Sequence, residues 1–108
     1  MRKVNVNTGS YRESLLKSLK NVDEAVQYLN ACLADDDPEV FLMALRDVAD
    51  AHGGIRALSK DAGLNRESLY RMLSKSGNPS LASLAAVLQA CGLRLAVLAK
   101  GTRTRRVA

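Results

Sequence analysis

A band of cationic, amide and hydroxyl side chains is expected on one face of a short helix that begins at Asn65 and ends near Ser76. Positions one, four, five and eight residues after Arg66 share one stripe of an α-helix. Arginine forks match the acceptors of guanine and amides match adenine. The face therefore predicts contacts with base edges in the major groove of DNA, made by Asn65, Arg66, Glu67, Tyr70 and Arg71.

An ordinary solvated helix face is the alternative interpretation of this band. Such a face more often alternates glutamate and lysine, whereas this one also holds an amide and an aromatic hydroxyl. Other side chains around it suit DNA phosphates, namely Arg56, Lys60, Ser74 and Lys75. The combination favours nucleic-acid contact over a merely solvated surface.

A second short helix is predicted just before the band, from Ile55 to about Asp61. The turn between the two helices contains Gly63, and glycine accepts the left-handed backbone that redirects the chain steeply. Two short helices joined in this way form a helix-turn-helix, here over residues 55–76. The apolar residues that would close the pair on its neighbours are Ile55, Leu58, Ala62, Leu64, Leu69, Met72 and Leu73.

Capping patterns place further helices around this pair. A capping box at Ser10 and Glu13 predicts a helix over Tyr11–Leu19. Asn21 and Glu24 repeat the pattern and open a helix with an apolar stripe that reaches Leu33.

Two more helices complete the expected set. Asp37 followed by Pro38 starts one that runs to about Ala51, and Ser80 caps a last one that ends at Gly92. The sequence thus predicts an all-α fold of five to six short helices. Residues 10–100 would form one domain, between a flexible arm over residues 1–9 and a basic flexible tail over residues 101–108.

The segment Leu93 to Lys100 alternates apolar and other residues at first and predicts one short strand. A single strand cannot satisfy its own edges, so it must pair with something. A second copy of the chain is the simplest partner, which predicts a homodimer interface at Leu93, Leu95 and Val97. One recognition helix also reads too few base pairs for useful specificity, and this favours a dimer as well.

Charge is divided between the two halves of the chain. The whole chain has 16 Lys and Arg against 11 Asp and Glu, a net charge of +5. The first fifty residues hold nine acids and six bases, and the remainder holds two acids and ten bases. A basic half suits a polyanion, while the acidic half could bind a basic protein. Several of its acids also suit helix starts, which leaves Asp35 and Asp36 as the better candidates for a partner.

Other classes of protein are disfavoured. The apolar stretch Leu81 to Ala99 is interrupted by polar residues and the first ten residues lack an apolar run, so a cytoplasmic chain is expected without membrane contact. Two cysteines and one histidine give no metal-ligand spacing, and no nucleophile has an evident base beside it. We expect no enzyme activity, no catalytic residue, no metal and no cofactor.

The segments LxxxxGLxRESLYxxLSxxGNPSLxxL and AVQYLNACLADDDPEVFLMALRDV resemble the addiction-module antidote family, HigA-like antitoxins within the Xre/Cro-type helix-turn-helix group. The resemblance covers roughly residues 11–97. One departure is Ser59, where the Xre/Cro pattern usually has alanine, and its hydroxyl must be hydrogen-bonded if it is buried.

The resemblance implies a lambda-repressor-like DNA-binding domain. It also implies a function: the antitoxin of a type II toxin–antitoxin module, which neutralises a RelE/ParE-like toxin and represses its own operon at a double-stranded DNA operator. Two alternatives stay open at this point. One is a free-standing prophage-type repressor without a toxin, and the other is a protein-interaction module that binds no DNA.

Overall fold

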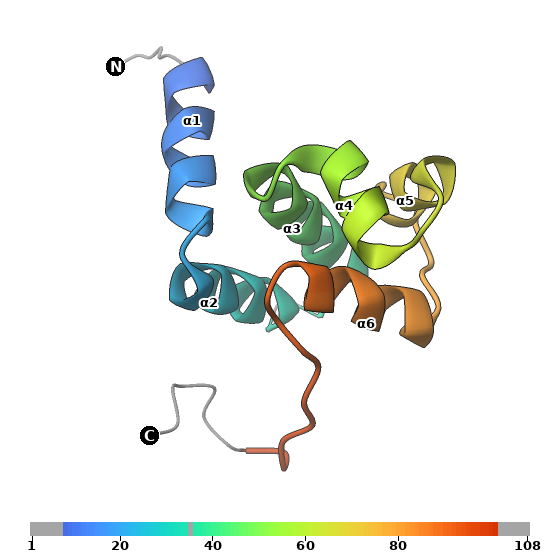
Figure 1. Cartoon of the computed structure of the whole chain (residues 1–108). Coiled ribbons are helices and arrows are strands. Elements are labelled where there is room, and N and C mark those ends of the chain that lie inside the picture. Colours follow the sequence, from blue (N-terminus) through green and yellow to red (C-terminus); the bar gives the residue numbers. More distant parts are fainter. Residues whose placement is uncertain (1–7, 35, 102–108) are drawn as a thin grey trace.

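The computed structural model of the chain describes residues 8–34 and 36–101, and in these ranges it is all-helical (Figure 1). Six helices follow one another: α1 Thr8–Leu19, α2 Val22–Leu33, α3 Pro38–Ala51, α4 Gly54–Ala62, α5 Arg66–Met72 and α6 Leu81–Ala90. The expected fold class is thereby confirmed at the level of an all-α domain.

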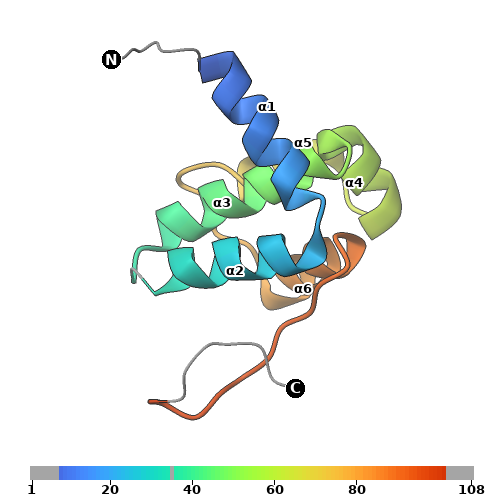
Figure 2. The same cartoon turned by 90° about the vertical axis from the view of Figure 1, so that its left-hand side faces the viewer.

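Helix α3 is the centre of the fold. It contacts α1, α2 and α4, while α4 also packs on α5 and α6. Leu45 and Val48 of α3 are fully buried, as are Leu58 of α4 and Leu69 of α5. Figure 2 shows α2 and α3 side by side and α1 projecting beyond them. One apolar cluster thus joins the helices, and α1 lies at its edge.

Four helices begin where the sequence predicted them to begin. Asn21, Asp37, Asn65 and Ser80 each accept a hydrogen bond from a backbone N–H in the first turn of the helix that follows. These bonds satisfy amides that have no partner inside the helix. The predicted capping box at Ser10 is wrong, because α1 already begins at Thr8 and Ser10 lies inside it. Thr8 and Gly9, which were expected in the arm over residues 1–9, belong to α1, and the rest of the arm lies outside the described ranges.

Helix α5 is shorter than predicted, because it ends at Met72 instead of near Ser76. The Ser74 hydroxyl donates a hydrogen bond of 2.7 Å to the carbonyl of Arg71, and Gly77 N–H donates to the carbonyl of Ser74. A Cβ at Gly77 would lie 2.2 Å from the carbonyl oxygen of Met72. The chain therefore folds back tightly over the end of α5, and only glycine fits at that point.

The predicted strand over residues 93–100 is absent, since residues 93–99 have no regular structure in the chain as described. A strand requires hydrogen bonds to a neighbouring strand, and none occurs within residues 8–34 and 36–101. This segment instead begins with Leu93, which donates its N–H to the Leu88 carbonyl and packs against the core. It runs away from the helices, and Val97 is 98% exposed (Figures 1 and 2). Apart from Gly101, the basic tail predicted for residues 101–108 lies outside the described ranges.

Several residues of the predicted apolar stripes face solvent instead of the core. On α2 only Ala25 and Leu29 are buried, while Leu33 is 54% exposed. Leu81, an apolar residue in the first turn of α6, is 72% exposed. Periodicity thus located these helices, but overstated the width of their buried faces. No helix in residues 8–34 and 36–101 is both long and apolar enough to cross a membrane.

Candidate nucleic-acid interface and partner surface

The turn between α4 and α5 sets the direction of α5. Gly63 ends α4 with a left-handed backbone, φ +69°, as predicted from its position. The Ser59 hydroxyl donates a hydrogen bond to the Leu64 carbonyl across this turn. This bond satisfies the Ser59 hydroxyl, and it braces the turn from the α4 side.

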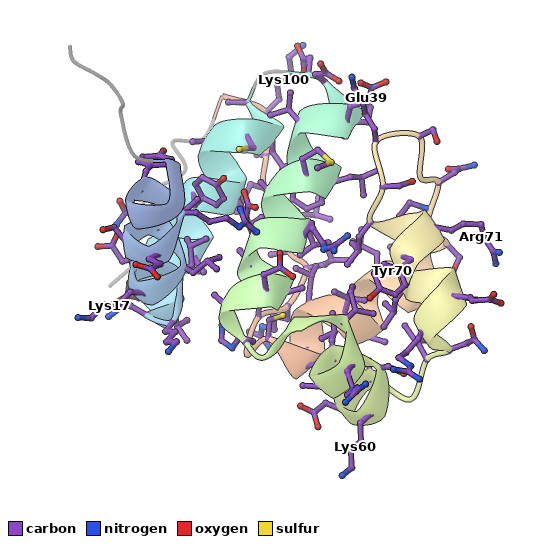
Figure 3. The ribbon with its side chains drawn as sticks, turned by 90° about the horizontal axis from the view of Figure 1, so that it is seen from above. Lys17, Glu39, Lys60, Tyr70, Arg71 and Lys100 are labelled. Carbon is purple, nitrogen blue, oxygen red and sulfur yellow. The ribbon has the colours of Figure 1, made fainter. Side chains whose placement is uncertain are left out.

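Helix α5 is amphipathic in the predicted sense. Leu69 and Met72 are buried, and Leu73 just after the helix is fully buried. The five residues predicted to read bases are all exposed: Asn65, Arg66, Glu67, Tyr70 and Arg71. Figure 3 shows Arg71 pointing away from the body of the protein, whereas Tyr70 faces α3. The structure thus brings the band together on one accessible helix.

Two side chains predicted to contact DNA also form hydrogen bonds with the protein backbone, which the sequence pattern did not reveal. The Asn65 side chain accepts a hydrogen bond of 3.1 Å from Ser68 N–H, so its oxygen serves as the cap of α5. Its amide N–H₂ group keeps its donors for a ligand. Ser74 lies beyond the end of α5 and cannot continue the helical stripe. Its hydroxyl hydrogen is used in the bond to Arg71.

A contact that sequence reasoning missed connects α5 to α3. The guanidinium of Arg46 lies 5.4 Å from the centroid of the Tyr70 ring, a cation–π distance. Arg46 also pairs with Asp50 at 3.4 Å. The i, i+4 spacing of Arg46 and Asp50 could have suggested their ion pair, but the stacking on Tyr70 joins residues far apart in the sequence. Arg46 is therefore a positioning residue for the Tyr70 ring.

The predicted phosphate-binding cations also lie on the surface. Arg56, Lys60 and Lys75 are exposed, and Lys60 points outward from α4 (Figure 3). None of the cations of α4, α5 or the loop after α5 forms an ion pair with a described residue, while all the ion pairs found in the described ranges use Arg12 or Arg46. The basic half therefore presents cations that no ion pair with a described residue neutralises.

A polar hollow of about 420 Å³ opens between the end of α5 and the start of α6. Arg71 lines it, together with five serines, Ser68, Ser74, Ser76, Ser80 and Ser83. Cationic and hydroxyl groups together are the usual protein partners of DNA phosphate oxygens. The hollow thus extends the polar surface of α5 toward α6.

The acidic candidates lie at the turn between α2 and α3. Asp36 is exposed and has a left-handed backbone, φ +57°, while Asp35 lies outside the described residues. Asp37 caps α3 through a 3.0 Å bond from Glu39 N–H, as expected. Both Asp36 and Asp37 line a mainly apolar groove of about 390 Å³ that also includes Leu33, Phe41 and Leu84.

A polar network attaches α1 to α3. Arg12 donates hydrogen bonds of 3.1 Å to Asp47 and 2.6 Å to Asp50, and the Tyr28 hydroxyl donates one of 2.6 Å to Asp47. Burial, followed by the bond to Asp47, raises the pKa of Tyr28 well above its usual value. The hydroxyl therefore remains a donor to Asp47 throughout the physiological pH range.

The remaining chemically distinctive side chains are those of the two cysteines and the histidine. Cys91 is buried, and burial raises the pKa of its thiol to about 11, so the thiol is protonated at neutral pH. Cys32 is half-buried. The backbone N–H of His52 donates to the Ala49 carbonyl at the end of α3. The buried Nε2 of the His52 ring has no hydrogen-bond partner among the described residues. No group of three or more metal-ligating side chains occurs within residues 8–34 and 36–101.

Comparison with known proteins gives the chain a family. A sequence model described as "Probable addiction module antidote protein" matches residues 19–99. An uncharacterized protein of Haemophilus influenzae (strain ATCC 51907 / DSM 11121 / KW20 / Rd) is 39% identical over 79 residues, which cover 73% of this chain and 80% of that protein. No solved structure gives a significant match. The matched range contains α2 through α6, and the chain belongs to the family of probable addiction module antidote proteins.

Proposed function

We propose that this chain is the antitoxin of a type II toxin–antitoxin module that binds the operator of its own operon and neutralises a RelE/ParE-like toxin. The membership of an antidote family supports the toxin-neutralising part, because an antidote implies a toxin partner. The observation that carries the DNA-binding part is the exposed polar band of α5, which is anchored by the fully buried Leu69.

In this proposal α4 and α5 form a helix-turn-helix of the HigA-like, Xre/Cro type, with α5 as the recognition helix. Asn65, Arg66, Glu67, Tyr70 and Arg71 contact base edges. The surrounding cations contact phosphates, namely Arg56, Lys60 and Lys75. Ser74 joins them only if its hydroxyl exchanges the Arg71 carbonyl for a phosphate oxygen. Support comes from the exposure of the α5 band and from the unpaired cations around it.

The chain would act as a homodimer, so that two copies of α5 read a pseudo-palindromic site with half-sites about 34–36 Å apart. The segment after α6 is the proposed interface, through Leu93, Leu95 and Val97. It leaves the helical body, and Leu95, Val97 and Leu98 are exposed apolar residues in a single chain. Pairing with the same segment of a second copy would cover them and supply the hydrogen bonds that a strand needs.

Binding of specific and random DNA duplexes by two single variants tests the DNA-binding proposal. Arg66→Ala should weaken binding to the operator by about 1–3 kcal/mol more than binding to random DNA, because it removes a base contact. Lys60→Ala should weaken binding to both duplexes by the same factor and reduce the salt dependence. If Arg66→Ala lost the same factor on both duplexes, its base-reading role would be wrong.

Co-expression with the product of the neighbouring gene tests the antidote proposal. We expect the small basic partner to co-purify with this chain and to arrest growth when it is expressed alone. Growth arrest that this chain does not relieve would contradict the proposal. A DNA-binding chain with no toxic neighbour would be a free-standing repressor instead.

A further inference from the structure

We infer that the groove between the α2–α3 turn and the loop before α6 is the docking site for a basic amphipathic segment of the toxin. This inference rests on the proposed function, and it replaces a general acidic surface with a defined site. The occupant is a protein segment that inserts apolar side chains into the groove and places lysine or arginine at its rim.

The floor of the groove is apolar and comes from three parts of the chain. Leu33 ends α2, Pro38, Phe41 and Leu42 belong to the first half of α3, and Leu84 belongs to α6. Leu33 is 54% exposed although it continues the apolar stripe of α2. Leu81, at the start of the same helix as Leu84, is also largely exposed. An apolar floor with exposed apolar neighbours is typical of a surface that a partner covers.

The rim of the groove carries negative charge. Asp36 and Asp37 line it. The next hollow along α3, about 450 Å³ in volume, is lined by three acids and one cation, namely Asp37, Glu39, Asp47 and Lys75. Figure 3 shows Glu39 at the end of the molecule where α3 begins, well away from Lys60 on α4. A cationic partner would be attracted to this end, and the apolar floor would favour one with apolar side chains between its cations.

The backbone at the rim is set by its two aspartates. Asp36 occupies a left-handed conformation that aspartate and asparagine tolerate better than most residues. Asp37 uses one carboxylate oxygen to cap α3. Both duties can be performed by asparagine, so the charge of the rim can be removed without disturbing the turn.

The groove shares a wall with the proposed DNA surface. Gly77, Asn78 and Pro79 line both the apolar groove and the polar hollow beside Arg71. Gly77 also packs against the carbonyl of Met72, at the end of α5. A segment seated in the groove would therefore contact the loop that fixes the end of the recognition helix.

The inference is tested by measuring the dissociation constant of the purified product of the neighbouring gene for variants of the full chain. Leu33→Glu places a charge on the apolar floor, and Asp36→Asn combined with Asp37→Asn neutralises the rim. We expect each change to weaken binding at least about tenfold at physiological salt. The double variant should also flatten the dependence of binding on salt, because it removes attraction between opposite charges.

Matched controls lie on the same helix. Val26→Glu makes the same kind of change two turns before Leu33, at a position that does not line the groove. Asp23→Asn with Glu24→Gln removes two charges from the first turn of α2. Both controls should bind like the wild type, and circular dichroism should show that all variants fold.

Three other outcomes of these experiments would each overturn the inference, and they can be told apart. Undiminished binding by both groove variants would show that the toxin docks elsewhere, while the antidote function would stand. A wild-type chain that does not bind the neighbouring product would refute the antidote function and this site together. A Leu33→Glu variant that changes a dimer to a monomer in sedimentation experiments would assign the groove to a second copy of the chain.

Discussion

Helix α1 and the α4–α6 region are attached to the central helix α3 by different forces. The α4–α6 region supplies buried apolar residues along its length, namely Ile55, Leu58, Leu69, Met72, Leu73, Val87, Leu88 and Cys91. The fully buried residue of the described part of α1 is Leu19, at its end, while Leu15 and Leu16 are partly buried. Near the start of α1 the link is polar and consists of Arg12 with Asp47 and Asp50.

The difference separates a rigid region from an adjustable one. Burial of apolar surface is non-directional and fixes α4 and α5 strongly, which suits the proposed fit of α5 to a DNA groove. Surface ion pairs contribute little and weaken with salt, so the start of α1 is held less firmly. We therefore expect opening of α1 to leave the α5 surface intact.

The largest effect is expected from shortening a core side chain on the rigid side. Leu58→Ala should reduce the free energy of unfolding by about 2–5 kcal/mol, because it leaves a cavity between helices. Leu16→Ala, at a partly buried position of α1, should reduce it by clearly less in the same urea titration. Equal losses would mean that α1 is as firmly packed as α4, and the contrast between the regions would fail.

A smaller effect is expected at the contact that joins α3 to α5, the proposed DNA-reading helix. Arg46→Met keeps an apolar stem but removes the cation over Tyr70, so binding to the operator should weaken by about 0.5–1 kcal/mol, a factor of roughly two to five. In a Tyr70→Ala background the same change should have almost no effect, because the ring that Arg46 positions is then missing. An unaltered loss in that background would show that Arg46 acts by another route.

The smallest effect is expected from releasing α1. Arg12→Met should cost about 0–1 kcal/mol of stability, since its ion pairs are largely exposed to solvent. Amide hydrogen exchange in α1 should become faster, while exchange in α5 and binding to the operator stay unchanged. Lys17→Met, on the same helix, forms no ion pair with a described residue and serves as the control. Faster exchange in α5 would show that the two regions are coupled through α3.

Local patterns predicted most of the helices. The caps at Asn21, Asp37 and Ser80 were identified correctly, because a capping side chain satisfies backbone amides a few residues away and needs no distant partner. Asn65 was predicted only as the start of a helix, and its capping role emerged from the structure. The capping prediction at Ser10 was wrong because it used only this local spacing. The spacing of Ser10 and Glu13 fits a capping box, although the helix begins at Thr8.

The candidate DNA surface was also within reach of the sequence. The period of the apolar residues in α5 placed Arg66 and Arg71 on the exposed face, and Gly63 marked the turn before it. Contacts between residues far apart in the chain could not be predicted from the sequence. Examples are the stacking of Arg46 on Tyr70 and the groove that joins Leu33 to Leu84.

The sequence by itself determined that the chain is helical, where a turn redirects it toward α5, and that its charges divide between two halves. These properties depend on neighbours within a few residues, so spacing and residue type suffice. Only the tertiary structure decided that α5 stops at Met72 and that Leu33 faces a groove. It also decided that residues 93–99 form no strand in a single chain. Those outcomes depend on which surfaces other helices cover, and on whether a partner supplies the hydrogen bonds that one chain lacks.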